Sequence, residues 1–330
     1  MIKPPRLAWI AWIAVCVIWG TTYLGIRVSL ESIPPALMAG FRWSIAGAIL
    51  TAVVLVRGGS LPPHRTWPGL ALLGLLMIGF GNGFVVWAEQ FVPSGLTAVV
   101  IATSPFWMVA SEAMFGGERL GRGALAGLIV GFAGIVLLVW PDIQAGGAHA
   151  AQFAGGLVAL QLACAGWAAG SSFAKRHKQD DIVAATAMQM LFGGVLMLAI
   201  GSFAGEWPRL VFTPRTAAAL TYLTLAGSLG AFLAYSYALR HLPVSTVSLY
   251  AYINPIIAVV LGALVLNEPF GSRVIVAAGL VLAGLALVRY ASAHPSAQRG
   301  SSARATPESG RRPLLSWWSS RLRGRAAAAR

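Results

Sequence analysis

Apolar runs of about twenty residues recur along most of this chain, separated by short connectors rich in proline and glycine. About twenty apolar residues in a helix cross the ~30 Å hydrocarbon core of a bilayer. Because lipid offers the backbone no hydrogen-bond partner, such runs must be helical. Only 10% of the residues are charged, against about 25% in a soluble domain, too few to cover a water-facing surface. The sequence therefore predicts an all-α membrane protein.

Ten transmembrane helices are predicted, with edges defined to within a few residues. They cover residues 7–26, 35–56, 67–88, 94–115, 123–140, 154–174, 182–203, 217–239, 244–266 and 273–290. No connector between them is long enough to form a soluble domain. We divide the chain into a first half of five helices (1–142), a second half of five helices (143–290) and a basic tail (291–330).

The two halves carry matching residues. A shift of 150 aligns residues 88–137 with the second half at ten identical positions in fifty, and the informative pairs are Pro93/Pro243, Pro105/Pro255, Glu118/Glu268, Gly121/Gly271 and Gly134/Gly284. A weaker match, at a shift of 148, links residues 16–27 to residues 164–175. Since five helices are an odd number, the second half must enter the membrane from the opposite side. The sequence thus predicts an inverted-topology repeat, a common architecture of secondary transporters.

Lys and Arg residues favour one orientation. With a cytoplasmic N-terminus, the inside connectors and span edges hold eleven of them and the outside ones hold four. Cytoplasmic loops carry such an excess of positive charge. We expect a multi-pass protein of the plasma (inner) membrane with both termini in the cytoplasm.

Several motifs give the chain a family resemblance. They are the run WGTTYLGIR at 19–27, the intramembrane sequence Phe41-Arg42-Trp43, and the pattern Pro93-x11-Pro105-x12-Glu118 with its partner Pro243-x11-Pro255-x12-Glu268. Over residues 8–290 the chain resembles EamA-type transporters of the drug/metabolite transporter superfamily. The resemblance implies a substrate cavity near the membrane midplane, lined by helices 1–4 and 6–9, with helices 5 and 10 at the periphery. It also implies transport of amino acids, other metabolites or drugs, commonly coupled to ion or proton gradients.

Arg42 is the only basic residue well inside a span. Its guanidinium could bind a carboxylate-bearing substrate. Alternatively, it could form an ion pair with Glu89 at the outer end of helix 3, or extend to the interface. The sequence leaves these alternatives open.

Glu112 lies inside helix 4, and its counterpart in the second half is Gly262. A charge within a span costs ~2.5–3.5 kcal/mol on insertion scales, so Glu112 is a candidate for substrate or proton binding. The alternative is an ion pair with Arg119 or Arg122, about two turns further along the chain.

Pro105 and Pro255 are predicted to bend helices 4 and 9, because proline removes one backbone hydrogen bond. Such bends could be purely structural or could also shape the substrate site. The residues expected at that site are Trp19, Tyr23, Arg42, Ser104, Trp107, Glu112, Tyr250, Tyr252 and Asn254. Glu118 and Glu268 stand just before the fifth helix of each half, where we expect each carboxylate to cap that next helix.

The tail after Tyr290 holds eight Arg and one acid, Glu308. We expect it to be a disordered, solvated segment, or to touch anionic lipid headgroups through residues 314–323. No nucleic-acid partner is expected, since no folded reading module accompanies the arginines. Cys16 and Cys164 both fall inside spans, and all five histidines lie in connectors or the tail, so no disulfide, metal site or cofactor is expected.

The predicted function is secondary transport by alternating access, with export of a small metabolite, amino acid or drug-like solute. Proton coupling is a hypothesis that depends on Glu112 and Glu89 as the available carboxylates. A non-transporting sensor or assembly subunit is an alternative. A membrane-embedded enzyme is another, although the sequence shows no intramembrane Asp pair, His–Glu metal motif or Ser–His pair. The oligomeric state is open.

Overall fold

The computed structural model describes residues 5–114, 122–144, 147–268 and 271–293, and every regular element in these residues is a helix. Seven of the described helices are long and apolar enough to cross a membrane: Arg6–Ser29, Pro35–Val56, His64–Ala88, Ser94–Met114, Gly147–Arg176, Ile182–Phe203 and Pro214–His241. Two shorter apolar helices, Ile253–Leu266 and Ser272–Gly284, accompany them. The prediction of an all-α membrane protein is confirmed, and the count of ten spans stays a prediction.

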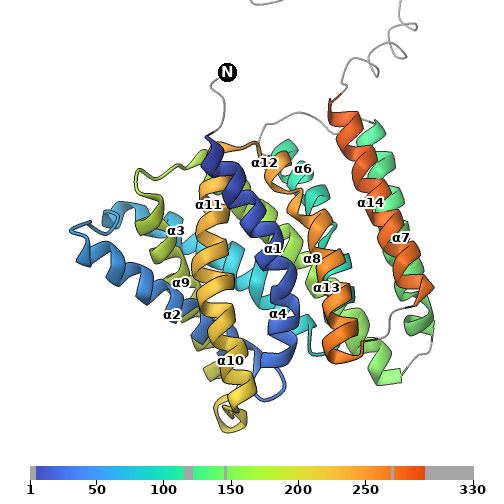
Figure 1. The fold of residues 1–330 in the computed structure, drawn as a ribbon, viewed down its shortest axis with the longest axis horizontal. Coiled ribbons are helices and arrows are strands. Elements are labelled where there is room, and N and C mark those ends of the chain that lie inside the picture. Colours follow the sequence, from blue (N-terminus) through green and yellow to red (C-terminus); the bar gives the residue numbers. More distant parts are fainter. Residues whose placement is uncertain (1–4, 115–121, 145–146, 269–270, 294–330) are drawn as a thin grey trace, which may run out of the picture. The chain divides into compact units, whose positions relative to one another are not determined.

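In the described residues, six of the predicted spans each consist of one uninterrupted α-helix (Figure 1). They are α1 (Arg6–Ser29), α2 (Pro35–Val56), α7 (Arg122–Gln144), α8 (Gly147–Arg176), α9 (Ile182–Phe203) and α14 (Ser272–Ala293). Short 3-10 turns, η1 (His64–Thr66) and η3 (Trp207–Arg209), lie in two of the connectors.

The third and eighth predicted spans each contain a π-helical segment. One runs through α3 (Trp67–Leu73), η2 (Gly74–Gly83) and α4 (Phe84–Ala88). The other runs through α10 (Pro214–Tyr222), η4 (Leu223–Gly230) and α11 (Ala231–His241). π-Helical turns are rare and frequently mark functional sites. They occupy corresponding places in the two halves.

The fourth and ninth predicted spans are interrupted by turns. The fourth consists of α5 (Ser94–Ile101) and α6 (Ser104–Met114), and the ninth of α12 (Val244–Val247) and α13 (Tyr250–Leu266). The first interruption lies just before Pro105, and the Ile101 carbonyl, which Pro105 cannot bond, accepts the Ser104 hydroxyl at 2.6 Å. Pro255 lies inside α13, and the interruption of that span comes earlier, at Ser248 and Leu249.

Helices of the first half pack against helices of the second. The main pairs are α2 with α9, α7 with α14, α1 with α11 and α13, and α8 with η2 and α6. Figure 1 shows α7 and α14 side by side at one edge of the bundle. The first-half helix α1 and the second-half helix α8 thus contact mainly the opposite half.

Small residues bring these helix backbones together. A Cβ added to Gly47 of α2 would lie 2.8 Å from the backbone nitrogen of Leu191 in α9. One added to Gly284 of α14 would lie 2.5 Å from the nitrogen of Gly131 in α7. Close approach at small residues is the usual way in which transmembrane helices associate.

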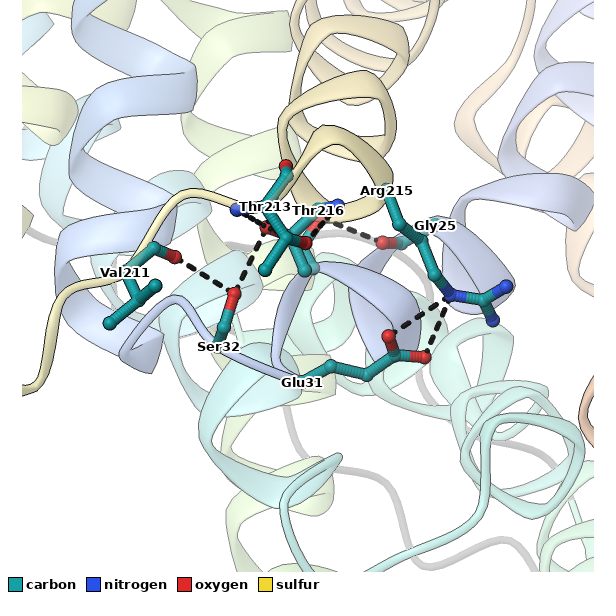
Figure 2. Close-up of polar contacts among 8 residues, drawn as sticks. Gly25, Glu31, Ser32, Val211, Thr213, Arg215 and Thr216 are labelled. Atoms are coloured by element: carbon teal, nitrogen blue, oxygen red, sulfur yellow. Dashed lines mark hydrogen bonds and ion pairs between the residues drawn. The ribbon is translucent and has the colours of Figure 1, made fainter.

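At one end of the bundle, the turn between α1 and α2 is bound to the segment that precedes α10 (Figure 2). Ser32 Oγ donates to the Val211 carbonyl at 2.8 Å and lies 3.0 Å from Thr216 Oγ1. Glu31 and Arg215 form an exposed ion pair at 3.0 Å. Glu206, buried in the same region, accepts the Leu37 backbone N–H at 2.8 Å at the start of α2. These contacts join the two halves.

Glu268 caps a helix, but not the one expected. Its carboxylate accepts the backbone N–H of Ser94 at 2.8 Å, the Ser94 hydroxyl at 2.8 Å and the N–H of Gly95 at 3.0 Å. It therefore caps α5 of the opposite half, and the expectation that it caps the following helix, α14, is wrong. The chain leaves α13 through a left-handed residue, Asn267, which turns Glu268 back toward α5. Glu118 lies outside the described residues.

Gly262 makes room for this cap. A Cβ at position 262 would collide with the Glu268 carboxylate and lie 3.1 Å from Ser94 Oγ. The counterpart of Gly262 is Glu112, so the two halves use this position differently. The glycine is thus explained by the contact between α13 and α5.

We expect Glu268→Gln to lower the free energy of unfolding by about 1–2 kcal/mol, because a charged cap at a helix N-terminus is lost. Thermal unfolding in detergent measures the change. The control is Glu31→Gln, whose ion pair is exposed and should contribute about 0–1 kcal/mol. Equal melting temperatures for the two variants would contradict the role given to Glu268.

Candidate functional site

A cavity of about 80 Å³ lies among helices of both halves. Its lining consists of Trp19, Thr22, Tyr23 and Ile26 of α1, Arg42 and Trp43 of α2, Gly81, Asn82 and Val85 of η2 and α4, Ile101 and Ser104 of α5 and α6, Ala163, Cys164 and Trp167 of α8, and Tyr250 and Asn254 of α13. Ile101, Ser104 and Asn82 lie at or beside the interrupted and π-helical segments. Irregular backbone at membrane depth is tolerated where protein buries it or where it lines a cavity.

Most of the residues proposed for the site from sequence line this cavity. They are Trp19, Tyr23, Arg42, Ser104, Tyr250 and Asn254. Trp107 lies elsewhere and donates its indole N–H to Gln161 Oε1 at 2.9 Å. The side chain of Tyr252 lies outside the described residues.

Glu112 lies outside the cavity lining and is bound to α8. Arg176 donates to its carboxylate at 2.9 and 3.1 Å, and Ser172 Oγ donates at 2.8 Å. Both side chains of the ion pair are about one third exposed, at 32% and 34%. An ion pair was one of the two alternatives, but its partner is Arg176 rather than Arg119 or Arg122. Arg119 and the side chain of Arg122 lie outside the described residues.

Arg42 is buried, with 2% of its surface exposed. Its Nε donates to Ser228 Oγ of η4 at 2.7 Å, whereas its Nη1 is buried without a hydrogen-bond partner. The ion pair with Glu89, one of the alternatives left open by the sequence, is not formed among the residues that the structure describes. A buried charged donor without a partner costs more than the 1–3 kcal/mol of a neutral one. The Arg42 guanidinium thus contributes a buried positive charge to the cavity lining and retains an unpaired donor.

Glu89 follows the last residue of the His64–Ala88 span and is completely buried. Both oxygens of its carboxyl group lack a hydrogen-bond partner, while its backbone carbonyl accepts from Arg27 Nη1. Burial raises the pKa of this carboxyl group well above its usual range; Glu268 adds to the effect, and Arg27 and Arg42 oppose it. Burial without a hydrogen-bond partner thus favours the neutral, protonated form of this carboxyl group.

Aromatic side chains from both halves meet at Trp19. Its ring lies 5.2 Å edge-on from Trp167, 5.0 Å from Tyr235 and 5.2 Å edge-on from Tyr250, measured between ring centroids. Such distances are typical of favourable aromatic pairs. Trp19 and Trp167 are the tryptophans that the shift of 148 aligns, so equivalent residues of the two halves contact each other.

A second cavity, also of about 80 Å³, lies near the C-terminal ends of α8 and α11. We call it the basic vestibule, because Lys175, His177, Lys178 and Arg240 contribute to its lining. Lys175 Nζ donates to the carbonyl oxygens of Leu239 and Leu242 at 2.5 and 2.8 Å. It thus binds the negative end of a helix dipole.

One hydrogen-bonded layer separates the two cavities. Trp167 lines the first cavity and Tyr235 the basic vestibule. The Tyr235 hydroxyl accepts from Trp167 Nε1 at 3.1 Å and lies 2.7 Å from Ser171 Oγ. These hydrogen bonds connect the lining of the first cavity to that of the basic vestibule.

Sequence reasoning missed Asn82, Ser228 and Tyr235 as site residues. Asn82 Oδ1 accepts the indole N–H of Trp43 at 2.7 Å, and Ser228 holds Arg42. Both are polar residues inside apolar runs, which was an available signal. Their orientation depends on π-helical turns, for which the sequence has no periodic pattern.

The EamA-like transporter family model matches this chain twice, over residues 6–140 and 154–290. The chain belongs to the EamA-like transporter family. It is 37% identical over 278 residues to the "Uncharacterized inner membrane transporter YedA" of Escherichia coli K12, covering 83% of this chain and 88% of that protein. The predicted membership in the drug/metabolite transporter superfamily is confirmed.

Other EamA relatives are more distant. A WAT1-related chloroplastic protein of Arabidopsis thaliana is 28% identical and covers 86% of this chain and 70% of that protein. "Uncharacterized transporter YvbV" of Bacillus subtilis is 26% identical, covering 84% and 89%. A solved crystal structure has the same fold, with a TM-score of 0.65 and 21% identity over 88% of this chain and 98% of that one. These names support membrane transport and specify no substrate.

We expect Ser228→Ala to destabilise the protein by about 1–3 kcal/mol, because the buried Arg42 guanidinium loses its hydrogen-bond acceptor. Thermal unfolding in detergent measures this. Thr221→Ala, one turn before η4, is the matched control: its exposed hydroxyl bonds only the Ala217 carbonyl of its own helix. A Ser228 variant as stable as this control would show that Arg42 does not need that acceptor.

Proposed function

We propose that this EamA family member is a secondary transporter that exports a small metabolite, amino acid or drug-like solute by alternating access. The observation that carries the proposal is the cavity between the two halves, whose lining includes Arg42, a buried cation with an unpartnered Nη1. A buried cation beside a polar and aromatic cavity is the expected form of a solute site in a transmembrane bundle.

We further propose that the chain has ten spans in two inverted repeats. Support comes from the ends of α1 and α8. Trp12, early in α1, donates to the Val247 carbonyl at 3.1 Å, and Lys175, at the end of α8, donates to the nearby Leu242 carbonyl. The start of α1 therefore lies near the end of α8, as expected if the two helices run in opposite directions. In Figure 1 the start of α1 and the end of α14 lie at the same end of the bundle, which favours an even number of spans.

A matching pair of cations also supports the repeat. Arg27 and Lys175 correspond at the shift of 148, and Glu89 and Leu239 correspond at the shift of 150. Arg27 donates to the carbonyl of Glu89, and Lys175 donates to that of Leu239. Each half thus uses the end of its first helix to bind the end of its third.

The size of the cavity favours alternating access. Binding sites for small molecules usually measure about 300–1,000 Å³, and this cavity is about 80 Å³. The layer formed by Trp167, Tyr235 and Ser171 closes it toward the basic vestibule. We propose that rocking of one half against the other widens the cavity and opens this layer.

Export is proposed from the orientation. The excess of Lys and Arg places both termini, and with them the basic vestibule, on the cytoplasmic side of the plasma (inner) membrane. The cavity would then be loaded from the cytoplasm.

Proton coupling is proposed to depend on Glu89. Its buried carboxyl group has no partner, so it can take up and release a proton when the halves move. Glu112 is already neutralised by Arg176.

Tags in two connectors test the topology. We expect a tag within residues 58–66 to react with an impermeant reagent only from the cytoplasm, and a tag within 204–214 only from outside. An inverted repeat places these connectors on opposite faces. Reaction of both tags from one face would contradict the inverted repeat, and a tag at each terminus controls for the overall orientation.

Flux of labelled candidate solutes into proteoliposomes tests transport and coupling. We expect the rate for the responding solute to change with an imposed pH gradient. Glu89→Gln should remove that dependence because it cannot exchange a proton, and Arg42→Gln should reduce flux at least tenfold. The control, Glu112→Gln, should keep both flux and gradient dependence. Gradient-insensitive flux in the unmodified protein would contradict proton coupling but not transport, whereas binding without flux would favour a sensor.

A further inference from the structure

We propose that the cavity binds a monocarboxylate that carries an aromatic ring and lacks an ammonium group. This inference rests on the proposed function, since it names the class of solute that the same cavity takes. It follows from the hydrogen-bond donors, the charge and the rings of the cavity lining.

Two donors are available to a carboxylate. The first is the guanidinium of Arg42, which contributes to the lining, is fixed through Nε by Ser228 at 2.7 Å and has a buried Nη1 without a hydrogen-bond partner. The second is the amide nitrogen of Asn82. Because an indole N–H only donates, the 2.7 Å bond from Trp43 identifies the facing atom as Asn82 Oδ1, which leaves the NH₂ group as a donor. A guanidinium and an amide NH₂ together match the acceptor oxygens of a carboxylate.

The other amide of the lining differs. With its nitrogen toward the backbone, Asn254 donates to the carbonyl oxygens of Cys16 at 2.9 Å and Tyr250 at 3.1 Å. Its NH₂ group is therefore already bonded. Arg42 and Asn82 place a cation and an amide donor on the side of the cavity formed by α2 and η2.

The charge of the lining argues against an ammonium group. Arg42 is the only charged residue among the described side chains that line the cavity. An ammonium group would lose its hydration and meet neutral side chains and a like charge. Glu89 does not contribute to the lining, and its burial favours the neutral form.

Aromatic side chains supply the remaining specificity. Trp19, Tyr23, Trp43, Trp167 and Tyr250 all line the cavity. Trp19 meets Trp167 and Tyr250 edge to face, at interplanar angles of 82° and 80°. Because these rings are nearly perpendicular to one another, the lining offers both ring faces and ring edges. The aromatic ring of a solute can pack against either.

The basic vestibule is consistent with an anion as well. Its Lys175 and Arg240 bind backbone carbonyl oxygens, at 2.8 Å to Leu242 and 2.8 Å to Gln179. No Asp or Glu is among the described side chains that line the vestibule. A mouth lined by one sign of charge concentrates solutes of the opposite sign.

Binding of 3-phenylpropionate to the full-length protein in detergent, measured by titration calorimetry, tests the proposal. Three matched compounds each change one feature: 3-phenylpropanol lacks the charge, propionate lacks the ring, and phenylalanine adds an ammonium group. We expect 3-phenylpropionate to bind at least tenfold more tightly than each of them. Arg42→Gln should weaken its binding at least tenfold and leave that of 3-phenylpropanol unchanged.

The control variant is Arg215→Gln, which removes an exposed arginine at the end of the bundle and should leave all four affinities unchanged. A thermal unfolding curve shows whether Arg42→Gln is folded. Asn82→Asp places a negative charge beside the carboxylate and provides an independent variant with the same expected loss.

Phenylalanine or 3-phenylpropanol binding as tightly as 3-phenylpropionate would overturn the proposal, as would the absence of binding by 3-phenylpropionate. Arg42-dependent flux of another solute would then leave the transport proposal intact, whereas binding of 3-phenylpropionate without flux would overturn transport and support the solute class.

Discussion

The absence of hydrogen-bond partners in lipid is the constraint on which this structure depends. It requires helices throughout the membrane and makes every departure from the α-helix costly unless another group satisfies the backbone. The departures from the α-helix described below lie around the cavity. The turn before Ser104 and the π-helical segment with Asn82 contribute to the cavity lining, and the π-helical segment with Ser228 holds Arg42. The Ile101 carbonyl freed by Pro105 is bonded by Ser104 itself. The residues that interrupt the regular helices therefore also form or support the cavity lining.

The ends of the helices are stabilised by charges from elsewhere in the chain. Glu206 and Glu268 accept backbone N–H groups at the starts of α2 and α5, and Arg27 and Lys175 donate to carbonyl oxygens at the ends of α4 and α11. Each charge has the sign that the helix dipole favours. These are two of the ten acids and two of the 24 Lys and Arg residues of the chain. Such contacts also join the halves, since both carboxylates belong to the second half and both helix starts to the first.

The sequence predicted the fold class, the family and most of the cavity, because those follow from hydrophobic length and from residues placed at fixed intervals. Trp19, Arg42, Ser104 and Asn254 were identified as polar or aromatic residues at membrane depth. The sequence did not identify the hydrogen-bond and ion-pair partners of the charged residues. Arg42 binds Ser228, which was not among its alternatives, Glu112 pairs with Arg176, and Glu268 caps α5 instead of α14. Each of these contacts joins segments more than sixty residues apart and needs the three-dimensional packing. A one-dimensional pattern shows that a charge needs a partner without showing which one.

The chemistry of the cavity lies in residues that the two halves do not share. Pro105 and Pro255, or Trp19 and Trp167, recur because both halves build the same helices and meet at the same central contact. Arg42 has no such counterpart: the second-half positions 190–192 are Met, Leu and Phe. No described residue of α9, the helix that corresponds to α2, lines the cavity. The duplication therefore accounts for the matching helices of the two halves. The charge of the cavity lining comes from Arg42, which belongs to the first half alone.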